Sequence, residues 1–214
     1  PQLFKPQRRI LEADMPGSAE KLDMLALCIE RLTGAGYVYI GMDHFAKPGD
    51  DLAVAQRQGR LHRNFQGYST HADSDLVACG VSAIGAVGAT YSQNAKTLEA
   101  YYEALDNNEL PVVRGIALGM DDLLRRTIIQ SLMCQFELSI HAIEQAFPIV
   151  FADYFAAELA QLRAHAADGL IVVEDGWLTV TPRGRLLIRN LCMVFDRYLA
   201  GAGPGAAARH SRTL

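Results

Sequence analysis

The sequence lacks the features that would place it in a membrane or in an oxidising compartment. No stretch of its 214 residues approaches the roughly 20 consecutive apolar residues that span a bilayer, and no signal-peptide pattern is present. Cysteines are few and dispersed, at Cys28, Cys79, Cys134 and Cys192. This spacing favours reduced thiols over a disulfide framework or a metal site, and Cys79, beside small apolar residues, is expected to be buried. We therefore expect a cytoplasmic protein without a membrane partner.

An excess of charge of one sign is also lacking. Twenty lysines and arginines face 24 acidic residues, so the net charge of −4 does not suggest a partner such as nucleic acid. Half of the residues are apolar, which excludes a disordered chain. The glycines at 80, 85 and 88 do not follow a phosphate-binding pattern. The length is compatible with one large domain or two small ones.

The first half of the chain shows a helix followed by a strand. Leu22, Leu25 and Ile29 recur at helical spacing after Ser18, which is a plausible N-cap. A short run of β-branched and aromatic residues at 37–40 then predicts a buried strand, and this order is typical of a parallel sheet. Further predictions are listed by range: helices at 50–58 and 97–105, an exposed polar loop at 61–73 and a bridging segment at 114–120.

The second half is predicted to be mainly helical. Apolar stripes indicate helices that begin at Asp121 and at Ser139, and a third over 151–166. Two strand-like runs at 170–173 and 177–180 flank Asp175-Gly176, which is a hairpin signal. Thr181-Pro182 then predicts the start of one final helix that continues to 199. Three helices, a hairpin and a helix resemble a winged-helix module.

Four short motifs carry a more specific signal. They are I-G-M-D-H-F at 40–45, L-H-R-N-F-Q-G-Y at 61–68, G-V-S-A-I at 80–84 and G-R-L-L-I-R-N at 184–190. In order and spacing they resemble the C-terminal half of the oxygen-independent coproporphyrinogen III oxidase family, which are radical S-adenosylmethionine (SAM) enzymes of haem biosynthesis. The resemblance covers residues 1–199.

The resemblance implies a fold of the class α/β plus mainly α. Residues 1–114 would supply the closing βα units of a partial (β/α) barrel, and residues 115–199 a helical, winged-helix-like C-terminal domain. Residues 200–214 are rich in glycine and alanine and are predicted to be a flexible tail.

The implied activity is that of a radical SAM oxidoreductase. It converts two propionates of coproporphyrinogen III to vinyl groups, which gives protoporphyrinogen IX. The implied cofactors are SAM and a 4Fe-4S cluster, which such enzymes hold with a C-x-x-x-C-x-x-C loop that this sequence lacks. We therefore expect a fragment that is inactive alone and whose partners are coproporphyrinogen III and a missing N-terminal half carrying the cluster ligands.

The resemblance also assigns two cofactor-binding residues. Gln66 would approach a second SAM molecule, and Ile84 would contact the SAM bound to the cluster. A glutamine amide offers two donors and an acceptor to a zwitterion, and an isoleucine can pack on adenine. On residue type alone, Gln66 would be a surface amide and Ile84 a core residue.

Other polar residues in the motifs are candidate site residues, and each has a functional and a structural interpretation. Arg63, with His62 beside it, could bind a substrate propionate, because a guanidinium pairs with a carboxylate in a fork. A solvated arginine or an internal salt bridge is the other reading. Asp43 and His44 follow the predicted strand and either belong to the site or brace the loop by local hydrogen bonds. No catalytic proton-transfer residue is assigned.

Two other functions are open at this point. A winged helix that binds DNA needs a basic recognition helix, whereas 151–166 carries Arg163 against Asp153 and Glu158, and residues 115–199 hold seven arginines, no lysine and ten acids. This charge argues against nucleic acid as a partner. Related haem-binding chaperones carry an H-N-x-x-Y-W motif, but no tryptophan follows Tyr68 here. The sequence therefore favours the oxidase.

Overall fold

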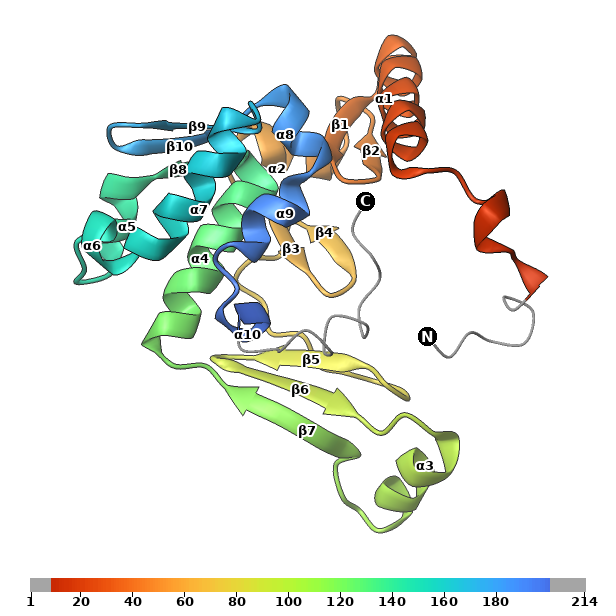
Figure 1. The fold of residues 1–214 in the computed structure, drawn as a ribbon. Coiled ribbons are helices and arrows are strands. Elements are labelled where there is room, and N and C mark those ends of the chain that lie inside the picture. The colour runs from red at the N-terminus through yellow and green to blue at the C-terminus, as the bar shows by residue number, and fades with distance from the viewer. Residues whose placement is uncertain (1–8, 201–214) are drawn as a thin grey trace.

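A computed structural model describes residues 9–200, which form two regions (Figure 1). We call residues 9–117 the N-terminal region and residues 118–200 the C-terminal region. The long helix α4 (Met120–Gln135) begins the C-terminal region and runs through the middle of the molecule. Apart from residue 200, the predicted tail lies outside the described residues.

The N-terminal region opens with a helix and a β-hairpin. Its first elements are a 3-10 turn (Glu12–Asp14), α1 (Ser18–Gly34), β1 (Val38–Gly41), β2 (His44–Ala46) and α2 (Asp51–Arg57). The predicted helices are confirmed, although Gly17 rather than Ser18 is the N-cap of α1. The strand predicted at 37–40 is also present, but it pairs antiparallel with β2. The left-handed backbone of Met42, with φ of 55°, reverses the chain between the two strands.

A second hairpin lies where an irregular polar loop was predicted. Residues 62–64 form β3 (His62–Asn64) and residues 67–69 form β4 (Gly67–Ser69), and they pair antiparallel. The Asn64 side chain accepts a hydrogen bond of 2.9 Å from the Gln66 backbone N–H and closes the turn. The prediction missed the hairpin because its polar residues do not show the apolar alternation of a half-buried strand.

The last part of the N-terminal region is a three-stranded antiparallel sheet. Its elements are β5 (Ile84–Val87), β6 (Thr90–Asn94), α3 (Leu98–Asp106) and β7 (Val112–Ala117), with the strand order β5-β6-β7. The helix at 97–105 is confirmed, and its N-cap Thr97 accepts a hydrogen bond from the Ala100 N–H. The segment predicted at 114–120 as a bridge to the second half does lead to α4, and its first part is β7, a strand that was not predicted. Within residues 9–200 all paired strands are antiparallel, so these residues do not form the expected parallel sheet by themselves.

The C-terminal region surrounds its own small sheet with helices. After α4 come β8 (Glu137–Ser139), α5 (Ile140–Ala146), α6 (Phe151–Tyr154), α7 (Ala156–Ala167), β9 (Ile171–Glu174) and β10 (Trp177–Val180). The predicted hairpin of β9 and β10 is confirmed, and β8 joins it in the antiparallel order β8-β10-β9. The helix predicted at 151–166 is divided at Phe155 into α6 and α7.

The predicted single final helix is three short helices. They are α8 (Pro182–Leu186), α9 (Ile188–Met193) and α10 (Arg197–Ala200). Thr181 caps α8 by accepting a hydrogen bond of 3.0 Å from the Gly184 N–H. The backbone of Gly184 packs directly against the Leu170 carbonyl oxygen, where a β-carbon would overlap it. This close approach explains the glycine that begins the fourth motif.

Two apolar cores lie on either side of α4. The larger core joins Leu124, Ile128 and Leu132 of α4 to Phe155 and to Phe195, and it extends through most elements of the C-terminal region. The smaller core lies in the N-terminal region around Ile40, Ala53 and Leu61, together with Cys134 of α4. The helix α4 therefore contributes residues to the cores of both regions. None of the helices within residues 9–200 has the length and apolarity needed to cross a membrane.

Candidate functional site

The second motif lies on the β3–β4 hairpin, and α4 holds this hairpin in place. The Gln130 side chain accepts a hydrogen bond of 3.1 Å from the Arg63 backbone N–H, and its amide nitrogen donates to the Arg63 carbonyl. Tyr68 donates to the Met133 carbonyl at 3.2 Å. Burial is the main cause of the raised pKa of Tyr68, so this hydroxyl remains a donor at neutral pH. The hairpin is thus fixed through backbone and side chain to one face of α4.

Gln66 lies at the turn of this hairpin and its side chain is exposed. Its backbone is fixed by Asn64, as described above. The side-chain amide of Gln66 is therefore held on an ordered turn, and it has no hydrogen-bond partner among the described residues.

Ile84 lines a small cavity beside the same hairpin. The cavity has a volume of about 270 Å³, and its walls are Phe65, Ile84, Tyr91, Ser92, Gln93, Arg114, Gly115 and Ile116. Ile84 is half-buried, so it is not the fully buried core residue that its type alone suggested. Phe65 contacts Tyr91 edge to face, with ring centroids 5.2 Å apart. The second and third motifs meet at this cavity, since Phe65 of the second and Ile84 of the third both line it.

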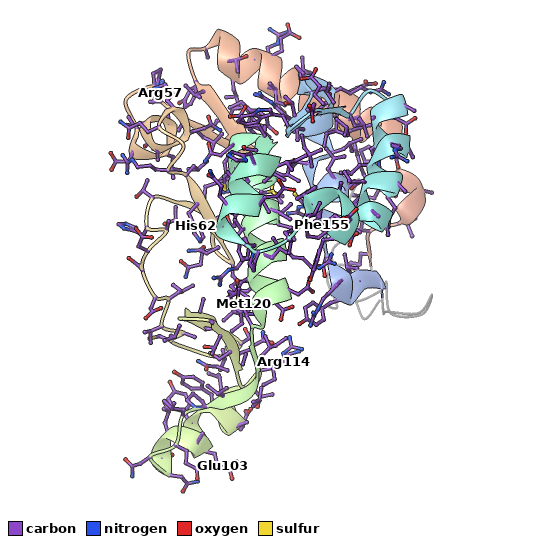
Figure 2. All side chains as sticks on the ribbon, turned by 90° about the vertical axis from the view of Figure 1, so that its left-hand side faces the viewer. Arg57, His62, Glu103, Arg114, Met120 and Phe155 are labelled. Atoms are coloured by element: carbon purple, nitrogen blue, oxygen red, sulfur yellow. The ribbon has the colours of Figure 1, made fainter. Side chains whose placement is uncertain are left out.

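A larger cavity of about 1010 Å³ lies between the hairpin, the β5–β7 sheet, α4 and α10. His62, Arg63 and Phe65 form one wall, and Tyr91 and Tyr198 lie on others. Figure 2 shows His62 on the strand beside α4, with Phe155 on the opposite side of that helix. The sequence-predicted Arg63 and Ile84 therefore lie in neighbouring cavities that share Phe65 and Tyr91.

Arg63 and His62 differ in their surroundings. The Arg63 guanidinium lies over the Tyr68 ring, 5.1 Å from its centroid, and forms no ion pair within residues 9–200. The internal salt bridge that was one reading of Arg63 is thus absent from the described chain. Burial, followed by the positive charge of Arg126, lowers the pKa of His62. His62 is accordingly neutral at pH 7 and can act as a hydrogen-bonding group.

A network of charges that the sequence reasoning missed closes one end of the larger cavity. Asp121 pairs with Arg125 at 2.9 Å and with Arg197 at 2.6 Å, and Arg125 also pairs with Glu158 at 2.8 Å. The nearly buried Asp122 accepts hydrogen bonds from the Gly119 N–H and the Tyr198 hydroxyl. The sequence showed Asp121-Asp122 as a helix start, but only the fold brings residues 197 and 198 to them.

The first motif forms the turn between β1 and β2. The His44 ring meets the Tyr68 ring edge to face at 5.1 Å, so the first and second motifs are in contact. His44 Nδ1 lies 2.8 Å from Asp43 Oδ1, although the angle does not make a hydrogen bond. Asp43 is largely exposed.

Two of the motifs contain a non-glycine residue with a left-handed backbone. They are Met42 in the first motif, with φ of 55°, and Ser82 in the third, with φ of 57°. Such strained positions often occur at functional sites.

The cysteines do not form a cluster site in this part of the chain. No three His, Cys, Asp or Glu side chains come together within residues 9–200 in a way that could hold a metal. Cys28 and Cys79 are exposed, so the predicted burial of Cys79 is wrong. Burial raises the pKa of Cys134 and of Cys192 to about 12, which keeps both thiols protonated. Thiolates are the form that binds iron, and these residues do not fit a cluster.

Comparison with known proteins shows which proteins this chain resembles. Residues 119–187 match the family described as the HemN C-terminal domain. The chain is 52% identical over 199 residues to oxygen-independent coproporphyrinogen III oxidases from Salmonella typhimurium and Escherichia coli, which covers 93% of this chain and 44% of each of those proteins. A Helicobacter pylori protein of the same name is 39% identical over 201 residues.

A solved structure agrees with these relatives. The E. coli coproporphyrinogen III oxidase HemN, described as a radical SAM enzyme, superposes with a TM-score of 0.84 and 53% identity, over 90% of this chain and 44% of that one. The chain thus spans less than half the length of these relatives. The resemblance predicted from the four motifs is confirmed, and the chain is similar to the C-terminal half of oxygen-independent coproporphyrinogen III oxidases.

Proposed function

We propose that this chain forms the C-terminal part of an oxygen-independent coproporphyrinogen III oxidase. The observation that carries the proposal is the 52% identity over 199 residues, which includes all four motifs, to proteins of that name. The enzyme would oxidatively decarboxylate two propionates of coproporphyrinogen III to vinyl groups. Its place of action would be the cytoplasm, as the cysteine pattern suggests.

We divide the chain into two parts for this function. Residues 1–114 would close a partial (β/α) barrel together with strands outside this chain, and residues 115–199 would form a winged-helix-like domain. The order α4, β8, α5, α6–α7, β9, β10 supports the second assignment, since it is helix, strand, two helices and a hairpin. The first assignment requires parallel partners for strands such as β1 from the rest of the enzyme. The boundary at 114/115 falls within β7, so this strand links the two parts.

The residues near the smaller cavity fit SAM. Ile84, with Phe65 and Tyr91, gives the cavity an apolar and aromatic wall on which an adenine ring can pack. Gln66 at the adjoining turn can donate to and accept from the amino and carboxylate groups of a second SAM. When bound, SAM supplies the radical that removes a hydrogen atom from a propionate β-carbon. The 4Fe-4S cluster does not fit the described cysteines, and we place its ligands outside this chain.

The larger cavity suits the substrate. Coproporphyrinogen III is a large macrocycle with four propionates, and the volume of about 1010 Å³ is at the upper end of the roughly 300–1,000 Å³ of small-molecule sites. Arg63 on its wall can bind a propionate in a bidentate fork. The chain would therefore contact both reactants through the β3–β4 hairpin, with Gln66 at the turn and Arg63 in β3. The acidic balance of residues 115–199 disfavours DNA as an alternative partner.

The test uses the full-length enzyme that contains this chain, reconstituted anaerobically with iron and sulfide. Wild type should form protoporphyrinogen IX and deoxyadenosine from coproporphyrinogen III and SAM. Gln66→Ala and Ile84→Asp should each reduce both products at least tenfold, whereas Gln161→Ala, an exposed glutamine on α7, should not. Cluster absorbance measured in each variant separates site effects from loss of the cluster.

Absence of turnover in a wild-type enzyme with an intact cluster would contradict the proposal. Tight stoichiometric haem binding under the same conditions would instead favour the haem-chaperone function.

A further inference from the structure

We propose that Arg126 binds a carboxylate of the substrate jointly with Arg63, across the larger cavity wall formed by α4 and β3. The inference rests on the proposed function, because the carboxylate would be a propionate of coproporphyrinogen III. It adds a residue that lies outside all four motifs and 63 positions further along the chain than Arg63.

The fold brings the two arginines to the same wall. Arg126 lies four residues, about one helical turn, before Gln130, so the two side chains share one face of α4. The Gln130 side chain forms hydrogen bonds with both the backbone N–H and the backbone carbonyl of Arg63. Side chains on a helix lean toward its N-terminus, which directs Arg126 from this face into the cavity that Arg63 also lines. Arg126 is also close enough to His62 for its positive charge to lower the pKa of His62, in addition to the effect of burial.

Neither guanidinium is neutralised within residues 9–200. Arg126 and Arg63 form no ion pair and no side-chain hydrogen bond there, although Arg126 is half-buried. The neighbouring Arg125 and Arg197 are, by contrast, each paired with two carboxylates. A half-buried cation without an anion is costly, and a bound carboxylate would remove that cost.

The acids that line the same cavity have other partners or are exposed. Asp122 binds Arg197 and Tyr198, Asp75 accepts from the Gly88 N–H, and Asp196 accepts from the Tyr198 N–H. Asp73 lies on an exposed loop, and its effect on the pKa of His62 is smaller than that of burial or of Arg126. The described chain thus leaves two positive charges on this wall for an incoming anion.

The rest of the wall fits the apolar body of a macrocycle. Ile129 and Met133 of α4 line the cavity on the same side, and Phe65, Tyr91 and Phe195 complete it with aromatic rings. An anionic ligand with a large apolar centre is therefore the class that this cavity recognises, because charge alone would not require such walls. His62, neutral at pH 7, can add a hydrogen bond without adding charge.

The experiment measures binding of coproporphyrin III, the stable oxidised form of the substrate, to the full-length protein by fluorescence titration. Arg126→Gln should weaken its binding roughly tenfold to a hundredfold, the effect of losing a charged hydrogen-bonded pair. Arg126→Lys should restore part of the affinity, because it keeps the charge and loses the fork. Arg163→Gln, an exposed arginine of α7, is the matched control and should bind as wild type does.

Two further measurements make the outcome specific. The tetramethyl ester of coproporphyrin III has no carboxylates, so wild type and Arg126→Gln should bind it equally. The double variant Arg63→Gln with Arg126→Gln should lose less than the product of the two single losses, because both residues hold one carboxylate.

Equal affinity of wild type and Arg126→Gln for coproporphyrin III would overturn this inference and leave the proposed function intact. A matching loss of ester affinity would also overturn it, since the substitution would then act on the shape of the cavity. Failure of wild type to bind coproporphyrin III and to turn over its reduced form would instead overturn the proposed function itself.

Discussion

The two regions of this molecule differ in how completely they bury their apolar residues. In the C-terminal region, Phe151, Phe155 and Phe195 are 0% exposed and belong to one continuous core. In the N-terminal region, Leu110 is 83% exposed and Val113 is 60% exposed, and every residue of β7 is exposed. Figure 2 shows the sheet and α3, marked by Arg114 and Glu103, extending away from the rest of the chain.

The difference indicates that the C-terminal region is a self-sufficient unit and that the N-terminal region is not. The 17-residue helix α1 contains no fully buried residue, and Met24 and Leu27 remain exposed on it. The N-terminal hairpins gain much of their order from α4, through Gln130 and Tyr68. Exposed apolar surface of this extent usually meets another protein surface. In the proposed enzyme, the exposed apolar residues of the N-terminal region would contact the part of the enzyme that lies outside this chain.

The largest expected effect follows from separating the regions. Residues 118–200, expressed alone, should unfold cooperatively in urea and bind little hydrophobic dye, because their core is complete. Residues 9–117 should bind dye and lack a cooperative transition, because they lose α4 and keep the exposed surfaces of α3 and β7. Dye fluorescence and circular dichroism during urea titration give both readouts. Cooperative unfolding of residues 9–117 would remove the distinction between the regions.

A substitution in each region should show the same contrast. Phe155→Ala removes a ring that packs on Phe151 at 4.9 Å and on Phe195 at 5.5 Å, and it should lower the free energy of unfolding by about 3–5 kcal/mol. Val113→Ala, on the exposed β7, should change it by less than about 0.5 kcal/mol. Urea unfolding of the 214-residue chain measures both. Similar losses in the two variants would show that β7 is buried in solution.

The contact between the regions should also be measurable. Gln130→Leu leaves the Arg63 N–H and C=O without partners and should destabilise the β3–β4 hairpin by about 1–3 kcal/mol. Hydrogen exchange of the Arg63 amide should accelerate roughly tenfold or more. Gln135→Leu is the control, since Gln135 makes a single bond of 3.4 Å to the Leu61 carbonyl and should have a smaller effect. Unchanged Arg63 exchange in Gln130→Leu would show that α4 does not hold the hairpin.

The smallest expected effect concerns acid stability of the C-terminal region. Burial disfavours the charge of Asp121, but hydrogen bonds from Arg197, Tyr154 and Arg125 outweigh it and lower the pKa of this carboxyl. Its contribution is therefore present above the unfolded pKa of about 3.9 and is lost as pH falls through the folded pKa.

Asp121→Asn should accordingly reduce stability at neutral pH by less than about 1 kcal/mol, because solvent screens the pairs, and the difference should vanish in strong acid. Thermal unfolding at a series of pH values measures it. Asp153→Asn, an exposed acid without an ion pair in the described chain, should leave the pH profile unchanged. A difference between Asp121→Asn and wild type that persists in strong acid would assign the effect to packing instead of charge.

Local signals in the sequence predicted much of the C-terminal region. The caps at Ser139 and Thr181 and the Asp175-Gly176 turn act through neighbouring backbone atoms, and all three are found as expected. Predictions failed where the pattern was polar or the helix was interrupted. The β3–β4 hairpin lacks apolar alternation, and the breaks at Phe155 and Leu187 depend on how these residues enter the core.

The sequence by itself determined the resemblance to oxygen-independent coproporphyrinogen III oxidases, because four motifs in order point to proteins that share half of its residues. It also determined the types of the site residues, such as an amide at Gln66 and a guanidinium at Arg63. Only the tertiary structure decided which residues meet. Arg126 and Gln130 come to Arg63, and Arg197 to Asp121, through packing of α4 against distant segments. Such contacts depend on three-dimensional distances, which local spacing and residue type do not encode.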